Sequence, residues 1–211
     1  MGIFAEKIRC LRGSGTKTFL KNSLSAGVII VVTALISACQ FGDRRIQFRE
    51  EVRLVNGELI SVDRVVKAKP LGEIGGPGGW EPIYMSLQIA EPKNPGSPPK
   101  WESEAGLVPI LFDRDPLTNE WVLLATFFTC EPWYRLGRPK LPYAEFRVRD
   151  GHWRQVDLST QWIGRSANIF TGIRSSGEPD MLTLSEKDRR DSDPAIAAKY
   201  RKIVGHWTTN C

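Results

Sequence analysis

The sequence has few of the residues and motifs on which most enzyme and metal sites depend. It contains only two histidines, His152 and His206, and neither a His-Glu-x-x-His nor a Gly-x-Ser-x-Gly motif, which excludes the usual signatures of zinc peptidases and serine hydrolases. Its four cysteines include no Cys-x-x-Cys pair, so the motifs of a thioredoxin-like redox site and a cysteine-rich zinc site are absent too. We therefore predict no metal and no cofactor, and the sequence favours a protein that is not an enzyme.

A long apolar run is also missing. The apolar segment from Leu24 to Ala38 has 15 residues, whereas a helix that crosses a bilayer needs about 20. A basic stretch ending at Lys21 precedes it, and the small residues Ser37 and Ala38 close it. A basic region, a short apolar region and small residues in this order are the parts of a secretory signal.

The end of this segment carries a resemblance to a known family. Ile36-Ser37-Ala38-Cys39 resembles the lipobox of bacterial lipoproteins, and the chain that follows is broadly similar to uncharacterised envelope lipoproteins of Gram-negative bacteria. The resemblance implies diacylglycerol on the Cys39 thiol, cleavage before Cys39 and acylation of the new amino group. Several chains matter for a stable anchor, because one acyl chain alone binds membranes only reversibly. Gln40 in place of aspartate implies sorting to the outer rather than the inner membrane. The alternative is an uncleaved signal-anchor helix.

These features divide the chain into three parts. We predict a signal peptide over residues 1–38, a tether over 39–45 and a single β-rich periplasmic domain over 46–211. The net charge of +5 lies mainly in residues 1–23, which hold five basic side chains and one acidic, whereas the rest holds 24 basic and 23 acidic. A nearly neutral mature domain has no field to attract nucleic acid.

Once Cys39 is assigned to lipid, two cysteines of the mature domain remain, Cys130 and Cys211. Thiols outside the cytoplasm can pair, but sequence does not supply the Cα separation that a disulfide requires. Two free thiols are the alternative.

Alternation of apolar and polar residues predicts most of the mature domain to be β. Residues 46–68 are expected to form a hairpin with a type I′ turn at Asn56-Gly57. A glycine- and proline-rich loop is expected over 70–82, followed by a strand over 83–90 and a second proline-rich loop over 91–102.

Two further hairpins follow. Residues 107–112 and 121–128 are apolar runs joined by a turn, and the second is apolar on both faces, as in a central strand. Pro109 indicates an edge or a bulge in the first run. Residues 143–149 alternate and turn at Asp150-Gly151 into 152–158. Asp113, Asp115 and Glu120 have spacing similar to a calcium loop, but Leu117 and Thr118 stand where it needs Asp or Asn and Gly, so a plain turn is predicted.

The carboxyl-terminal region predicts a helix. Asp193 has the position of a helix cap, and Pro194 has that of the first helical residue. Apolar residues then recur at helical spacing: Ile196, Tyr200, Ile203 and Val204. Gly205 follows as a stop. The predicted fold is therefore mainly β (α+β): an antiparallel sheet or sandwich built of hairpins, with a carboxyl-terminal helix packed on it.

The segment Cys130–Pro139 has the most unusual composition. It concentrates Trp133, Tyr134, Arg135 and Arg138, residue types that dominate protein interfaces when they are exposed. Buried, the same residues would fill the edge of a core, and exposure decides between the two interpretations. Each histidine adjoins a tryptophan (Trp153 and Trp207), and we expect both histidines to be partly buried.

The sequence leaves the function open between three classes. The first is a non-enzymatic, membrane-tethered binding module with a protein partner in the envelope, such as an immunity or envelope-assembly lipoprotein. The second is an enzyme or sugar-binding lipoprotein directed at peptidoglycan or another glycan, with Glu131 or Asp150 as acid/base groups. The third is a purely structural lipoprotein.

The lipidation of Cys39 is directly testable. Cys39→Ala removes the lipobox thiol that the resemblance implies as the acceptor of diacylglycerol, so the variant is expected to lose lipid labelling, to remain unprocessed and to leave the lipoprotein fraction. Metabolic labelling with a fatty acid and membrane fractionation measure this, with Cys10→Ala as the matched control. A Cys39→Ala protein that is still lipidated and processed contradicts the prediction.

Overall fold

The computed structural model of the chain describes residues 43–71, 79–91, 96–104, 106–127, 129–172, 178–191, 202–208 and 211. All of them belong to one compact unit, Phe41–Cys211. The predicted signal peptide, Cys39 and most of the predicted tether lie outside the described residues. No helix of the described part is long and apolar enough to cross a membrane.

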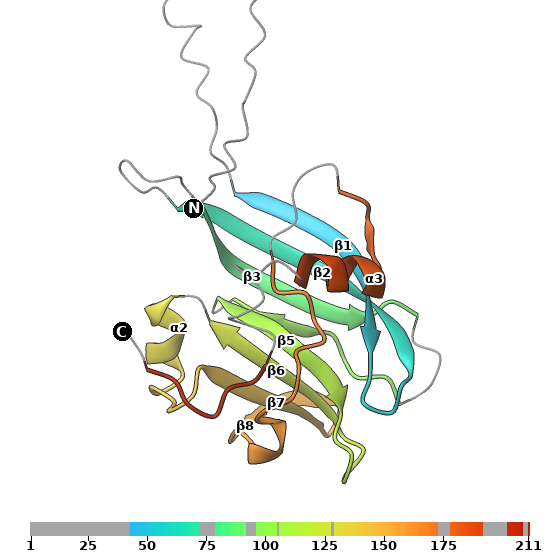
Figure 1. Ribbon diagram of the computed structural model, residues 1–211. Helices are drawn as coiled ribbons and strands as arrows, with labels where there is room; N and C mark the ends of the chain where they lie inside the picture. Colours follow the sequence, from blue (N-terminus) through green and yellow to red (C-terminus); the bar gives the residue numbers. More distant parts are fainter. Residues whose placement is uncertain are drawn as a thin grey trace, which may run out of the picture. The chain divides into compact units, whose positions relative to one another are not determined.

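The described domain is mainly β, as predicted, and consists of two sheets (Figure 1). The first sheet, here called sheet A, has the strand order β4-β3-β2-β1-β9, and the second, sheet B, has the order β5-β6-β7-β8. All neighbouring strands are antiparallel except β1 and β9. The strands are β1 (Arg44–Arg53), β2 (Leu59–Leu71), β3 (Gly79–Ile89), β4 (Trp101–Ser103), β5 (Leu107–Arg114), β6 (Trp121–Phe127), β7 (Tyr143–Arg149), β8 (His152–Val156) and β9 (Met181–Leu182).

The hairpin of β1 and β2 confirms the prediction for residues 46–68, but its turn is of another type. Gly57 has φ +87°, whereas Asn56 is not among the residues with positive φ, so the type I′ turn was wrong. The Gly57 N–H donates to the Leu54 carbonyl and the Leu54 N–H to the Glu58 carbonyl. This is a three-residue loop with its last residue left-handed, the form in which only one glycine is needed.

The loop predicted over residues 70–82 is shorter in the structure. β2 runs through Pro70 and β3 begins at Gly79, so Pro70 pairs with Trp80 and Pro82 with Ala68. Residues 72–78, with most of the glycine run, are outside the described part. The register of β2 and β3 shifts at Lys67/Ala68, and an irregularity of this kind lets a sheet accept a proline that cannot donate a ladder hydrogen bond.

Sheet B matches its sequence pattern closely. All seven residues of β6 are buried, and β6 lies between β5 and β7, which confirms the prediction of a central strand covered on both faces. Pro109 lies on β5, which is both an edge strand and irregular between Pro109 and Leu111. Asp150 and Gly151 have φ +52° and +73°, and these left-handed values are those of the two-residue hairpin turn that the sequence predicts.

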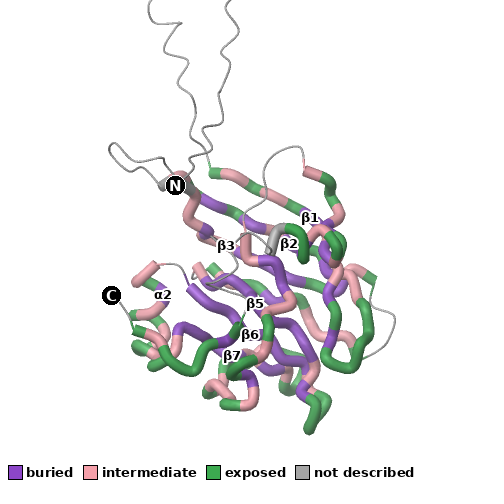
Figure 2. Tube along the Cα trace, in the orientation of Figure 1, coloured by how far each residue is buried: buried purple, intermediate pink, exposed green. Residues whose placement is uncertain are grey.

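The main hydrophobic core lies between the inner faces of the two sheets. Sheet A contributes Phe48, Val52, Val62, Val66, Met85 and Leu87, and sheet B contributes Leu107, Phe112, Leu123, Ala125 and Phe127. Figure 2 shows buried residues along β5 and β6, whose residues are almost all buried. One continuous core between the sheets makes the described part a sandwich.

The opposite face of sheet B is covered by irregular chain rather than by a second sheet. A smaller core joins Ile110, Val122 and Leu124 of this face to Trp162 and Ile203. Trp162 belongs to the short helix η1 (Thr160–Trp162). The backbone of residues 164–166 pairs with Lys202 and Ile203 through N–H to carbonyl bonds and one antiparallel bridge. The end of the chain therefore serves as a cover for sheet B.

This cover corrects the predicted bounds of the carboxyl-terminal helix. Residues 192–201 of that prediction lie outside the described part, but Lys202, Ile203 and Val204 are not helical. Ile203 is only 1% exposed and reaches its place on sheet B from non-helical backbone. The burial of its side chain outweighs the weak local preference for helix. A carboxyl-terminal helix packed on a sheet is present as predicted, but it comes earlier, at α3 (Leu184–Asp191), where it packs against β1.

A buried ion cluster fastens α3 to the inside of sheet A. Glu50 and Arg64, 0% and 1% exposed, are paired to each other, and Lys187 of α3 lies 2.9 Å from the other oxygen of Glu50. That oxygen also accepts the Phe170 N–H. The Lys187 ammonium donates in addition to the carbonyls of Glu51 and Asn168. Removing one of these three charged side chains would leave an uncompensated charge in the core. The cluster therefore holds α3 against β1 and β2.

A second charged cluster lies on the other face of sheet B. The Arg147 guanidinium is shared by three carboxylates, at 2.7 Å from Asp115, 2.9 Å from Glu120 and 2.7 Å from Glu145. Burial alone would raise the pKa of Asp115. The Leu117 N–H, the Gln161 amide and Arg147 outweigh burial and lower that pKa to about 2.

The lowered pKa predicts how stability depends on pH. Because the folded pKa of Asp115 lies below its ordinary value of 3.8, its contribution is complete above about pH 4 and is lost as the pH falls through 2. Asp115→Asn is therefore expected to lower the free energy of unfolding by about 2 kcal/mol at pH 6, and by progressively less toward pH 2.

Urea denaturation of the wild type and the variant between pH 2 and pH 7 measures this. The control is Asp157→Asn, since Asp157 is exposed. An Asp115→Asn deficit that stays constant down to pH 2 is incompatible with the ionised role of this carboxylate.

Candidate functional site

The segment that sequence analysis singled out forms a short helix, α2 (Cys130–Arg135). Pro132 lies in its first turn, where no N–H is needed for the helix. The helix ends where Gly137 and Arg138 take positive φ values of 77° and 60°, and their N–H groups donate to the carbonyls of Tyr134 and Trp133. Glycine after the last turn is the usual helix stop, and Arg138 is held next to it in a conformation that a non-glycine residue rarely adopts.

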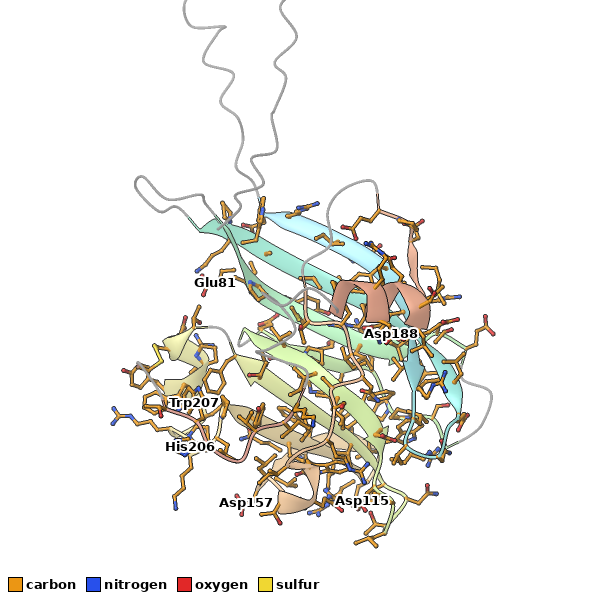
Figure 3. The ribbon with its side chains drawn as sticks, viewed as in Figure 1. Glu81, Asp115, Asp157, Asp188, His206 and Trp207 are labelled. Carbon is orange, nitrogen blue, oxygen red and sulfur yellow. A yellow bond between two sulfur atoms is a disulfide. The ribbon has the colours of Figure 1, made fainter. Side chains whose placement is uncertain are left out.

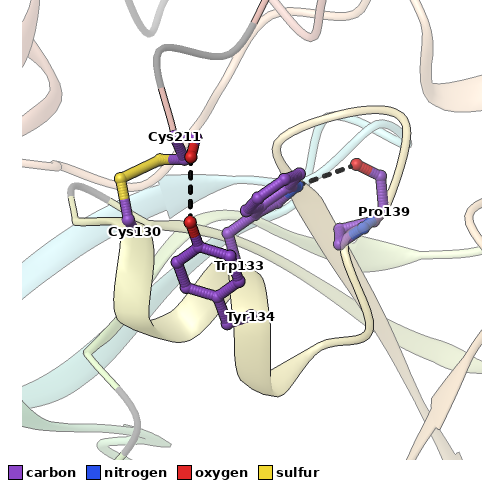
Figure 4. Close-up of a disulfide and its surroundings, with 5 residues drawn as sticks. All are labelled: Cys130, Trp133, Tyr134, Pro139 and Cys211. Carbon is purple, nitrogen blue, oxygen red and sulfur yellow. Dashed lines mark hydrogen bonds between the residues drawn. A yellow bond between two sulfur atoms is a disulfide. The ribbon is translucent and has the colours of Figure 1, made fainter.

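Cys130, the first residue of α2, and the final residue, Cys211, form a disulfide with a Cα–Cα distance of 5.5 Å (Figure 4). The two cysteines are 81 positions apart in the sequence. The hydroxyl of Tyr134, one turn along α2, donates to the Cys211 carbonyl at 2.8 Å. The disulfide and this hydrogen bond together fix the end of the chain on α2.

Trp133 belongs to the edge of the core. It is partly buried against the main core, and its indole N–H donates to the Pro139 carbonyl at 3.1 Å. Its ring lies 6.3 Å from that of Trp207, which in turn lies 5.8 Å from Phe127. For Trp133, therefore, the core-filling interpretation fits better than the binding one.

The other three predicted residues are exposed. Tyr134 is 47% exposed, and the Arg138 guanidinium lies over its ring at 5.2 Å from the centroid. Arg135 forms an ion pair with Glu131 one turn earlier. Tyr134, Arg135 and Arg138 thus form one exposed surface, called the α2 surface below.

The histidines do not lie where we expected. Both are exposed, whereas their neighbours Trp153 and Trp207 pack on the core. Successive side chains of a strand point to opposite faces, so on the edge strand β8 an inward Trp153 turns His152 outward. Figure 3 labels His206 and Trp207 on the stretch 202–208 at the end of the chain.

Two carboxylates proposed for glycan chemistry lie far from each other along the sheet. Glu131 follows the end of β6, where Thr126 pairs with Tyr143, the first residue of β7. Asp150 follows Arg149, the last residue of β7, and so lies at the opposite end of that strand. Glu131 is on α2 and is paired with Arg135. Glu131 and Asp150 therefore do not converge on one substrate.

A cavity of about 180 Å³ that sequence analysis missed lies between the ends of the two sheets and is lined by Glu58, Glu91, Arg114 and Trp121, among others. Trp121 offers no free ring face there. Phe112 stacks on one side, with centroids 4.9 Å apart and planes 16° apart, and the Arg114 guanidinium lies 4.2 Å from the ring centroid. A sugar has no aromatic platform at this point, because stacking needs an open face.

The carboxylates of the calcium-like spacing are occupied by the protein itself. Asp113 accepts the N–H groups of Val55 and Arg114, and burial raises its pKa. Asp115 closes the β5–β6 turn through the Leu117 N–H. Within the described ranges, no group of three His, Cys, Asp or Glu side chains is arranged to hold a metal ion.

Comparison with known proteins adds no assignment to this geometry. No family model, no curated protein and no solved structure matches the chain. The α2 surface, the disulfide and the cavity beside Trp121 therefore have to be interpreted from their own chemistry.

The disulfide predicts a large effect on stability. Cys130→Ser/Cys211→Ser opens a long covalent loop, so the free energy of unfolding is expected to fall by about 3–5 kcal/mol on the loop-entropy model, with a decrease in Tm on the order of 10 °C. Calorimetry of the wild type and the variant, each with and without reductant, measures this. Reductant should lower the Tm of the wild type to that of the variant, and a wild type insensitive to reductant contradicts the prediction.

Proposed function

We propose that this protein is a lipid-anchored cell-envelope protein, attached through Cys39 and facing the periplasm at the outer membrane, that acts as a non-enzymatic binding module. Its partner is another protein of the envelope or one that enters it, as an immunity or envelope-assembly lipoprotein would require. The α2 surface is the part of the domain that would contact this partner.

The observation that carries the proposal is the pairing of Cys130 with Cys211. A disulfide persists in oxidising compartments outside the cytoplasm, which agrees with an export signal that ends in the lipobox Ile36–Cys39. Cys130 and Cys211 are also the two cysteines that remain once the signal segment and Cys39 are set aside. The sequence pattern and the geometry therefore support the same compartment from independent residues.

The α2 surface supports protein binding through its composition and its rigidity. Tyrosine and arginine are enriched among the residues that contribute most to binding energy. Tyr134 is fixed by its bond to Cys211 and Arg138 by the backbone turn, so little conformational entropy is lost when a partner binds. Arg138 has no ion pair among the described residues, so a partner surface that presents a carboxylate would complement it.

The glycan-directed alternative has one observation in its favour, the cavity that brings Glu58 and Glu91 to a common wall. Arg114 lies in the same wall and covers Trp121, which works against sugar stacking. Saturation-transfer NMR with peptidoglycan fragments tests this second function. Binding that is lost in Glu58→Gln/Glu91→Gln would replace the first proposal.

The proposed interface is tested with the intact lipoprotein in native membranes. Tyr134→Ala/Arg138→Ala removes two side chains of the kind that cost more than 1 kcal/mol each at interface centres, so recovery of a crosslinked partner should fall at least tenfold. His152→Ala/Arg154→Ala on the exposed edge strand β8 is the matched control and should leave recovery unchanged. Equal recovery of the same partner by wild type and both variants contradicts a role for the α2 surface.

A further inference from the structure

One end of sheet A gathers basic side chains close to the point where the predicted lipid is attached. β1 starts at Arg44, and the register pairs Arg44 with Ala68 and Arg45 with Lys67. The same end of the sheet holds the last residues of β2 and the first of β3, where Lys69 pairs with Glu81. Residues 44–45, 67–70 and 80–81 are called the β1 tip below.

Three cations of the β1 tip form no ion pair with a described carboxylate: Arg44, Arg45 and Lys67. Instead, the Arg44 guanidinium lies 5.7 Å from the centroid of the Trp80 ring, and the Lys67 ammonium lies 4.7 Å from that of Tyr84. Lys69 is different, because it forms an ion pair with Glu81 at 3.0 Å. The tip therefore presents cations on aromatic rings, a combination that suits the boundary between water and lipid.

The length of chain between the lipid and the tip is short. Arg44 follows Cys39 by five residues, so even a fully extended connection spans at most about 18 Å. A domain anchored at Cys39 consequently keeps the β1 tip within a short distance of the headgroups. Basic side chains near an anionic membrane surface contribute about fivefold each to binding, an effect that falls off within a Debye length.

We propose that the β1 tip rests on anionic phospholipid headgroups, with Arg44, Arg45 and Lys67 facing lipid phosphates and Trp80 at the headgroup level. This inference rests on the proposed lipid anchor at Cys39. The described acids beside the tip are Asp43 and Glu81, which act on Lys69, and Glu102, on which Lys67 acts electrostatically. None of them forms an ion pair with Arg44, Arg45 or Lys67, so the attraction comes from these local cations and not from the net charge of the domain. Anchoring confines the domain, and the tip then sets its orientation.

The orientation has a consequence for the α2 surface. Pro132 of α2 lies beside Gly106, and Gly106 in turn lies beside the Pro82 carbonyl, at the tip end of sheet A. Glu131 also acts electrostatically on Lys69, whose pKa is raised mainly by its hydrogen bond with Glu81. In Figure 3, Glu81 lies on the same side of the domain as α2, whereas Asp115 lies at the opposite end. A partner would therefore meet the α2 surface close to the membrane.

The test uses the lipidated protein in vesicles whose lipid chains carry bromine near the headgroups, a quencher of tryptophan fluorescence. The difference between wild type and Trp80→Phe isolates the quenching of Trp80 from that of the other six tryptophans. In phosphatidylglycerol vesicles Trp80 should be quenched. In Arg44→Gln/Arg45→Gln/Lys67→Gln the quenching of Trp80 should fall at least tenfold. The lipidated wild type should show the same fall in phosphatidylcholine vesicles. It should also show it in phosphatidylglycerol vesicles at 1 M salt, where the Debye length is about 3 Å.

The matched control is Arg53→Gln/Arg149→Gln/Arg154→Gln, which removes the same charge from the far end of β1 and from sheet B and should leave the quenching of Trp80 unchanged. Quenching of Trp80 that is equal in both vesicle types and in both triple variants overturns the docking of the tip, while the anchor stands if the protein still floats with the vesicles. Protein that floats with neither vesicle type contradicts the lipid anchor itself, and the inference with it.

Discussion

The structure depends on the burial of sheet B on both faces. β6 is apolar throughout, so water has to be excluded from each of its sides, and two different parts of the chain do this. Sheet A covers one face and forms the main core, whereas η1 and the last residues cover the other through Trp162 and Ile203. A cover made of irregular chain has few backbone bonds of its own, which gives the disulfide between Cys130 and Cys211 its structural role.

The buried charges act where the covering segments meet the sheets. Glu50 binds Arg64 of β2, Lys187 of α3 and the Phe170 backbone, and thereby fixes the approach of the chain after η1 to sheet A. Arg147 gathers three carboxylates around the β5–β6 turn. Arg64 lines one wall of an open hollow beside β1 and β2, but both carboxylate oxygens of Glu50 are already occupied by Arg64, Lys187 and the Phe170 N–H. Both are best understood as polar contacts that select one arrangement of the layers, since mispaired alternatives would leave charge uncompensated.

The two proposals fit together through the position of α2. The disulfide fixes α2 to the chain end, the β1 tip lies beside α2, and the predicted lipid lies five residues before the tip. A binding module built this way has its partner surface fixed near the membrane rather than projecting into the periplasm. Such an arrangement would suit the proposed recognition of proteins at the membrane surface, and a short tether would give that recognition a defined orientation.

The sequence by itself determined the local elements with strong periodicity: the hairpins of β1–β2, β5–β6 and β7–β8, the buried centre of sheet B and the left-handed turn at Asp150-Gly151. It also predicted a signal and a lipid site, which lie outside the described residues. Only the tertiary structure decided the pairing of Cys130 with Cys211, the exposure of Tyr134 and Arg138 beside a half-buried Trp133, and the extended course of Lys202–Val204. Each of these depends on which distant surface a segment packs against, and a pattern within one segment does not contain that information.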